Sequence, residues 1–282
     1  MWYFALAHRP GKVREVMNLL ISYSLIQSVA HPPTAELDSH LRRLLKERNA
    51  TLEHFAKQDL EAAELLGKML AGYATLRKYY EIRDDESIPL ARRHQAAAAA
   101  LVLVIASSDD NIRGGLYDAS RDAIVSEDFL LALLGEALVF VNQSPSAITL
   151  DQLDVLLKAV EDIQAVGSRV YNTCDDFFQL VLASAPGLKG SSPADLLKKS
   201  TSNLSSGAAS YIMDGSSMLA SQLHRSISGS GTLAKANVKR GWDWRAGLTA
   251  STGAEDILRI LRLGLTKDMA RLWLEATDNG FA

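Results

Sequence analysis

The sequence predicts an all-α protein built as an irregular α-helical solenoid or stack. Apolar residues recur every three or four positions along most of the chain, and strand-like alternation between hairpin turns is absent. Capping residues and prolines divide the chain into about seven or eight helical segments. No repeat of fixed length links these segments, so a regular tetratricopeptide or ankyrin array is not expected. Short polar turns between helices favour a packed helical stack.

The first expected helix covers residues 11–30 and ends at the proline pair 32–33, since proline cannot continue a helix. Thr34 then stands where it can cap the next helix, or bent helix pair, over 35–71. A further helix over 70–82 is rich in tyrosine, and at helical spacing these rings are expected in the core rather than stacked on nucleic-acid bases. The tyrosines are Tyr73, Tyr79 and Tyr80.

An alanine-rich helix starts at Pro89. Its uncharged run 96–106 is shorter than the roughly 20 residues of a membrane-spanning helix, so we expect it to be buried in the protein. Residues 109–115 form a loop by composition. Ser126, followed by two acids, is expected to cap a helix over 129–142 with negative charge at its start.

Thr149 and Gln152 have the spacing of a capping box, which opens another long helical stretch. From 190 to 252 serine and glycine become dense, and we expect an insertion of low packing density that is partly helical. The chain then closes with an amphipathic helix within 253–282, which packs on the stack or on a partner. The predicted organisation is therefore a helical stack over 1–189, the insertion and the terminal helix.

Composition argues against several classes of function. The net charge is −3 and the pI is about 6.1, whereas nucleic-acid binders usually have a clear basic excess. The single Cys174 leaves no partner for an intramolecular disulfide and no multi-cysteine zinc site, which fits a reducing compartment, either nucleus or cytosol. No secretory signal is visible at the start of the chain.

No group of catalytic residues stands out, so an enzyme is not predicted. The chain has no P-loop, no nucleophile elbow and no His-Glu-x-x-His pattern, and its six histidines are scattered without metal-ligand spacing. The adjacent acids at 84–85, 109–110 and 175–176 are expected in solvated turns or helix ends. Cys174 is expected to be a packed thiol rather than a nucleophile. We therefore expect no catalytic residue, no cofactor and no metal.

The terminal helix carries the main candidate interface. Its apolar residues recur at helical spacing, so one face is apolar and is either ordinary core or a strip that anchors a partner helix. The candidates, with the arginines at the rim, are Leu261, Arg262, Leu265, Met269, Arg271, Leu272 and Trp273. A second candidate is the pair Trp242 and Trp244, which either docks a partner or folds back to pin the insertion onto the stack, the arrangement we favour.

The order of five segments resembles the C-terminal portion of the nucleoporin eighty-five family, outer-ring (Y-complex) scaffold proteins of the nuclear pore complex. The resemblance covers most of the chain outside roughly 190–252, and the residues at 2–31 resemble helices just upstream in that family. The five segments are 70–80, 93–105, 128–140, 148–162 and 257–271.

This resemblance implies a helical stack of the coat-scaffold type whose tail docks onto the C-terminal helical regions of other Y-complex nucleoporins at the hub. It implies a position at the nuclear envelope and support of mRNA export and protein import, with no direct nucleic acid, membrane insertion or small-molecule substrate. The chain then looks like a tail fragment, and Trp2, Tyr3 and Phe4 are expected to be exposed. The alternative is a helical adaptor in another RNA- or cargo-transport complex.

Overall fold

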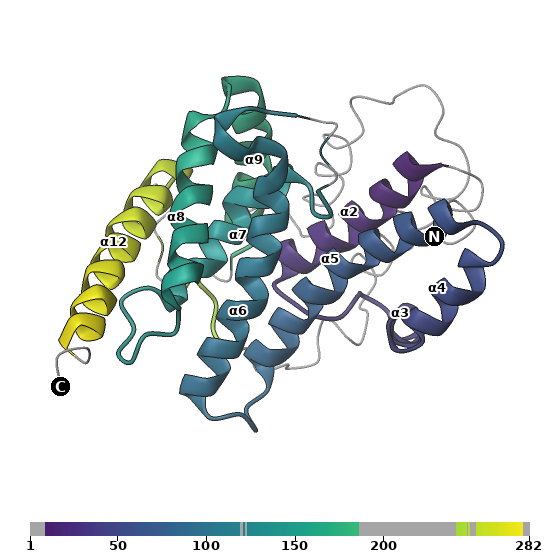
Figure 1. Ribbon diagram of the computed structural model, residues 1–282, viewed down its shortest axis with the longest axis horizontal. Coiled ribbons are helices and arrows are strands. Elements are labelled where there is room, and N and C mark those ends of the chain that lie inside the picture. Colours follow the sequence, from purple (N-terminus) through teal and green to yellow (C-terminus); the bar gives the residue numbers. More distant parts are fainter. Residues whose placement is uncertain are drawn as a thin grey trace. The chain divides into compact units, whose positions relative to one another are not determined.

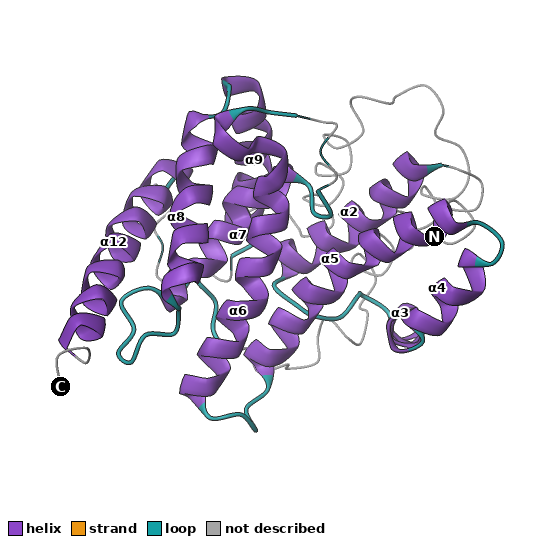
Figure 2. Ribbon diagram, viewed as in Figure 1, coloured by secondary structure: helices purple, strands orange, loops and turns teal. Residues whose placement is uncertain are grey.

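The computed structural model confirms the all-α class (Figure 2). Within the residues it describes, every regular element is a helix and no strand occurs. Trp2 to Phe4 and most of the predicted insertion lie outside the described part of the chain. The described residues are 9–118, 121, 123–185, 241–246, 248 and 252–278. The chain forms two compact units, Met1–Arg77 with Lys189–Val238, and Lys78–Leu188 with Lys239–Ala282.

The first unit begins with helix α2 (Pro10–Gln27), which buries most of its length. Its first turn starts at a proline, whose fixed φ suits that position. The helix ends at Ser28, which adopts a left-handed backbone (φ 52°) and donates its N–H to the Ser24 carbonyl. The helix therefore stops earlier than the predicted range of 11–30, because this C-cap ends it before the prolines are reached.

Helices α3 (Ala35–Lys46) and α4 (Arg48–Ala56) follow. The predicted cap is confirmed, since the Thr34 hydroxyl accepts a hydrogen bond from the Leu37 N–H at 3.3 Å. The bend within the predicted pair lies between these two short helices. A second break at residues 57–59 separates them from the next helix.

Helix α5 (Leu60–Asp84) is continuous, so the predicted junction near residue 70 is wrong. The Asp59 carboxylate accepts a hydrogen bond from the Ala62 N–H at 2.9 Å and caps the first turn. Buried residues then recur without interruption along the helix, which keeps one face in the core from end to end. They include Leu66, Leu70, Tyr73, Leu76 and Tyr80. The boundary between the two units falls within this helix.

The second unit is built around helix α7 (Leu130–Ala137), each residue of which is buried. Helices α6 (Leu90–Asp109), α8 (Leu150–Ala165), α9 (Ser168–Ala183) and α12 (Ala254–Asp278) all contact it, and Figure 1 shows α12 alongside α8. Three short 3-10 helices, η1 (Asp110–Gly115), η2 (Glu127–Phe129) and η3 (Leu138–Phe140), connect these elements. Among the helices described, none combines the length and apolar content of a membrane-spanning segment.

The predicted N-terminal caps of two helices in this unit are confirmed. Ser126 accepts a hydrogen bond from the Asp128 N–H, and Thr149 and Gln152 form both bonds of the capping box. The predicted helix over 129–142 is shorter, because its last turn tightens into η3. The long stretch after Thr149 is interrupted at Gly167, which precedes α9. The predicted loop at 109–115 is the 3-10 helix η1.

Candidate functional site

Helix α12 is attached to the second unit through an apolar inner face. Ile257, Leu258, Leu261 and Leu265 are each at most 1 % exposed, and α12 contacts α7, α8 and η3. The sequence left open whether Leu261 and Leu265 are core residues or partner anchors. The structure places both in the core of the chain's own second unit.

Gly264 lets the middle of α12 approach the segment that follows η3. A Cβ at this position would overlap the Cγ1 methyl group of Val141. The absence of a side chain therefore sets how closely the helix lies against this segment. Leu265, the next residue, is fully buried as a result of the same close approach.

A buried ion pair then fixes the C-terminal half of α12. Asp268 is 1 % exposed and accepts a hydrogen bond from the Asn142 N–H at 2.7 Å. Arg271 donates to the Asp268 carboxylate at 2.9 Å and to the Gln143 carbonyl at 2.7 Å. Arg271, predicted at the rim of an interface, is therefore engaged within its own unit. Truncating Arg271 would leave the buried Asp268 carboxylate without its cation.

The opposite face of α12 is exposed and apolar. Ile260, Leu263 and Leu274 are 50 %, 65 % and 66 % exposed, and their helical spacing places them along one line. Trp273 is 60 % exposed and lies at the edge of that line. We call Ile260, Leu263, Trp273 and Leu274 the outer strip. Several large apolar side chains exposed on one side of a helix are typical of a protein-interaction site.

The other predicted residues of α12 lie between the two faces. Met269 and Leu272 are half-buried, and Arg262 is exposed. Trp273 was among the predicted interface residues, whereas Ile260, Leu263 and Leu274 were not. The signal was present, because leucine and isoleucine occupy more than one face of this helix, which is unusual for a helix with a single buried side.

The second candidate pair is packed inside the second unit. Trp244 is 5 % exposed, stacks on Phe178 with ring centroids 5.9 Å apart, and lies over Gly135, where a Cβ would come within 2.6 Å of the indole. Trp242 meets the His94 ring edge-on at 4.7 Å. These contacts correspond to the folded-back arrangement. They also show that 241–246, assigned to a loosely packed insertion, is well packed in the structure.

Arg245 adds a polar attachment to this segment. Its guanidinium is almost fully buried and forms an ion pair with Asp243 at 2.8 Å. It also donates to the Val181 carbonyl at 3.2 Å and to the Ser184 hydroxyl at 2.7 Å, both at the end of α9. The segment is therefore held by two indoles and one satisfied buried charge.

The predicted core tyrosines are confirmed as core residues. Tyr79 and Tyr80 are fully buried, and their hydroxyls donate to the two oxygens of the buried Glu136 at 2.7 and 2.8 Å. Burial, and then the Glu136 charge, raise the pKa of both phenols well above the usual value, so both remain donors at neutral pH. The buried Glu136 carboxylate is therefore bonded to the two tyrosine hydroxyls and does not face a cavity.

The prediction of a solvated turn is wrong for Asp109. Its side chain is 5 % exposed, and burial followed by the nearby Asp162 charge raises the pKa of Asp109 to about 7. One buried oxygen of each carboxyl group has no donor among the described residues. Burial beside a second carboxyl group favours the protonated form of Asp109. Because Asp162 lies on another helix, the local composition around Asp109 did not reveal its burial.

Cys174 is buried, as expected of a packed thiol. Its Sγ lies 3.2 Å from the Glu127 carbonyl oxygen, to which the thiol donates. Burial, and then the charges of Asp128 and Glu127, raise the pKa of the thiol far above its usual value. A thiol in this state is a poor nucleophile. Among the described residues, no group of three His, Cys, Asp or Glu side chains is arranged to hold a metal ion.

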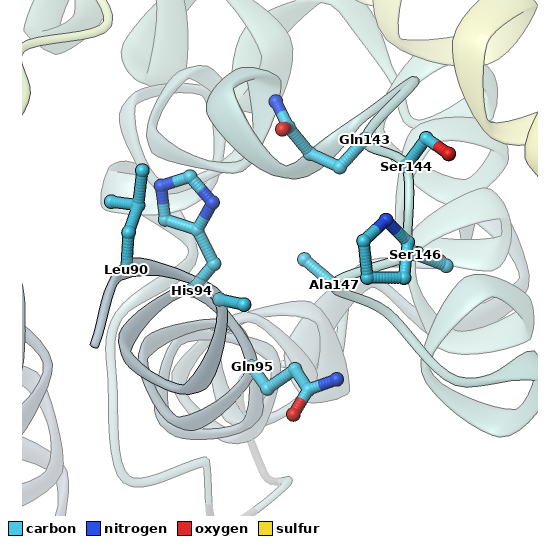
Figure 3. Close-up of a pocket in the computed structure, with 9 residues that line it drawn as sticks. Leu90, His94, Gln95, Gln143, Ser144, Ser146 and Ala147 are labelled. Carbon is cyan, nitrogen blue, oxygen red and sulfur yellow. The ribbon is translucent and has the colours of Figure 1, made fainter. Parts of the chain in front are cut away.

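One cavity of about 130 Å³ lies between the start of α6 and the segment before α8. Figure 3 shows His94 on one side of it and Ser144 to Ala147 on the other. Burial lowers the pKa of His94, so its ring is neutral near pH 7. Gln143, also in the wall, is bonded to the Val139 carbonyl at 2.9 Å. The cavity is smaller than typical ligand pockets of about 300–1,000 Å³ and gathers few polar groups.

Taken together, these features define a helical packing module with an exposed apolar helix face. No protein-family model and no solved structure matches the chain. A curated protein does match: nucleoporin NUP85 of Chaetomium thermophilum is 62 % identical over 297 aligned residues, which cover 99 % of this chain. The chain spans 25 % of the length of that protein. The predicted resemblance to the C-terminal portion of this nucleoporin is therefore confirmed.

Proposed function

We propose that this chain is a structural module of the nuclear pore complex that docks onto other scaffold nucleoporins through the outer strip of α12. The similarity to nucleoporin NUP85 supports the nuclear pore role. The observation that carries the docking surface is the exposure of Leu263, Trp273 and Leu274 on a helix whose other face is firmly packed. The proposed role is binding to other proteins and not catalysis.

Contacts within the second unit hold α12 in one position, and this favours binding of a partner to the outer strip. Its inner face is buried, and the Asp268–Arg271 pair fixes its second half. A partner therefore meets an ordered helix, which reduces the entropic cost of association. Leu261, Leu265 and Arg271 contribute by positioning the strip rather than by contact.

The partner is proposed to be a C-terminal helical region of another Y-complex nucleoporin at the hub. A stable interface of standard size buries roughly 1,600 Å², and a few buried anchors dominate its energy. Trp273 and the exposed leucines fit the anchor role. Met269, Leu272 and Arg262 lie at the rim. Through this assembly the module supports mRNA export and protein import at the nuclear envelope.

The test compares two double variants of the chain. Leu263→Asp with Leu274→Asp places charge on the outer strip, whereas Leu103→Asp with Leu116→Asp changes leucines that are 66 % and 71 % exposed elsewhere in the same unit. Tagged chains are incubated with nuclear extract, and the captured scaffold nucleoporins are quantified by mass spectrometry. Circular dichroism verifies that each variant retains its helix content.

We expect the α12 variant to lose at least about tenfold in capture, since charge at a buried anchor opposes desolvation. The control variant is expected to capture as much as the unmodified chain. Equal capture by both variants would contradict docking through the outer strip. Failure of the unmodified chain to capture any scaffold nucleoporin, or its absence from the nuclear rim as a fluorescent fusion, would contradict the nuclear pore role itself.

A further inference from the structure

The exposed acidic side chains that the structure describes on α12 have partners within the chain. Each exposed acid near the outer strip lies beside a cation or a hydroxyl donor of its own unit. The contacts are Asp256 with Arg259 at 3.2 Å, Glu255 with the Tyr171 hydroxyl at 3.0 Å, and Glu275 with Arg271 at 4.0 Å. These three exposed acids are thus each engaged by a side chain of their own unit, although Arg271 is shared between Glu275 and Asp268.

Two cations of the same helix are not compensated in this way. Arg262 and Lys267 are exposed, and their side chains form no ion pair or hydrogen bond with the rest of the described chain. Lys267 follows Leu263 by four residues and therefore lies on the line of the outer strip. Arg262 precedes Trp273 by three turns and lies on the side of the strip marked by that tryptophan. The outer strip is thus an apolar surface with unpaired positive charge.

We propose that the outer strip binds an amphipathic helix of another protein whose apolar face is flanked by Asp and Glu residues. This inference rests on the proposed docking function and specifies the chemistry of the partner. The apolar side chains of that helix cover Ile260, Leu263 and Leu274. Its carboxylates pair with Arg262 and Lys267, whose aliphatic stems extend the apolar contact. Complementary charge sets the partner and its register.

A second copy of this chain does not fit the surface as well. Lys267 lies at the middle of the strip between Ile260 and Leu274. A two-fold related copy would therefore place Lys267 opposite Lys267, because an isologous interface pairs the same surface with itself. Like charges at an interface suppress that pairing. An acidic helix meets the same lysine with the opposite charge.

The test uses two designed helical peptides that share one leucine face. One peptide has glutamate flanking this face, and the other has lysine at the same positions. Fluorescence anisotropy measures the binding of each to the full chain. We expect the acidic peptide to bind about three- to tenfold more tightly at low salt, with a difference that shrinks as salt is added.

Charge reversal supplies the matched variants. Arg262→Glu with Lys267→Glu is expected to reverse the preference between the peptides. Arg43→Glu with Arg92→Glu makes the same change in net charge at exposed positions outside α12 and is expected to leave the preference unchanged. Equal binding of the two peptides, binding of neither, or an unchanged preference in the α12 variant overturns the inference.

Two further outcomes separate this inference from the docking function. If capture of scaffold nucleoporins is lost with Leu263→Asp and Leu274→Asp but unaffected by reversal of Arg262 and Lys267, the docking function stands and the acidic helix is overturned. A concentration-dependent dimer that Leu263→Asp dissociates identifies a second copy as the occupant and also overturns it.

Discussion

Replacement of Asp109 by asparagine is expected to stabilise the protein, and the gain is expected to grow with pH. Asp109 on α6 and Asp162 on α8 are 5 % and 6 % exposed, and burial with the Asp162 charge raises the pKa of Asp109 from 3.8 to about 7. Arg113 and Lys158 oppose this change with positive charge. The folded protein therefore keeps a proton that the unfolded chain has already released between these two pH values.

Proton linkage sets the direction in which the stability of the folded chain changes with pH. Between pH 3.8 and about 7 the unfolded chain binds fewer protons at Asp109 than the folded chain, so stability falls as the pH rises. A change of one in pKa corresponds to about 1.4 kcal/mol, so the loss in free energy of unfolding over this interval is at most about 4 kcal/mol. Relaxation of the carboxylates toward water lowers the expected effect to about 2 kcal/mol. Asparagine cannot ionise, so it places no charge in this buried site at any of these pH values.

Urea unfolding of Asp109→Asn and the unmodified chain at pH 4 and pH 8 tests this. We expect nearly equal stability at pH 4, and a variant about 2 kcal/mol more stable at pH 8. Asp154→Asn, which changes an exposed carboxylate on α8, is the control and is expected to show little pH-dependent difference. A stability difference for Asp109→Asn that is the same at both pH values, or a loss of stability at pH 8, would refute the raised pKa of Asp109 in the folded protein.

Two further pairs of substitutions, each with its own control, test the packing of the second unit. Trp244→Ala removes a buried indole and is expected to cost about 3–5 kcal/mol in urea unfolding, whereas Trp273→Ala on the exposed face is expected to change stability by less than about 0.5 kcal/mol. Similar costs for both would contradict the buried position of Trp244. Gly264→Val is expected to lift α12 from Val141 and to speed hydrogen exchange along that helix, whereas Gly11→Ala, which meets no atom within 4 Å, is expected to leave α12 unchanged. Unaltered exchange in Gly264→Val would contradict the close approach.

The all-α class and several helix starts were predictable from the sequence because their signals are local. Thr34 and Ser126 each bond a backbone N–H within three residues, and Thr149 with Gln152 completes a capping box. Such contacts depend on neighbouring residues and hardly on the rest of the fold.

Features that depend on distant residues were not predictable in the same way. Asp109 is surrounded by polar neighbours in sequence, yet its environment is set by Asp162 on another helix. Likewise, α5 continues through residue 70, where Leu66, Leu70 and Tyr73 are buried by segments distant in the sequence. A polar residue next to a predicted turn is therefore assigned to solvent until the packing partner is known.

For a related reason, the sequence predicted the apolar face of α12 but not which side of the helix is exposed. Periodicity shows that Leu261 and Leu265 share an apolar face, but it does not say whether the surface that covers them belongs to the same chain. In the structure it does, and the exposed leucines of the helix are Leu263 and Leu274 on the opposite side. Only the fold separates the inner face of α12 from its outer strip.

The central claim, that the outer strip joins this helical module to other scaffold nucleoporins, is tested most directly by site-specific photo-crosslinking. A photo-reactive amino acid replaces Leu263 in one protein and Leu103 in another, and cross-linked peptides from assembled pores are identified by mass spectrometry. We expect position 263 to cross-link to a helix of another scaffold nucleoporin and position 103 to yield no such product. Cross-links to scaffold nucleoporins from position 103 alone, or products from 263 confined to this chain, would contradict the claim.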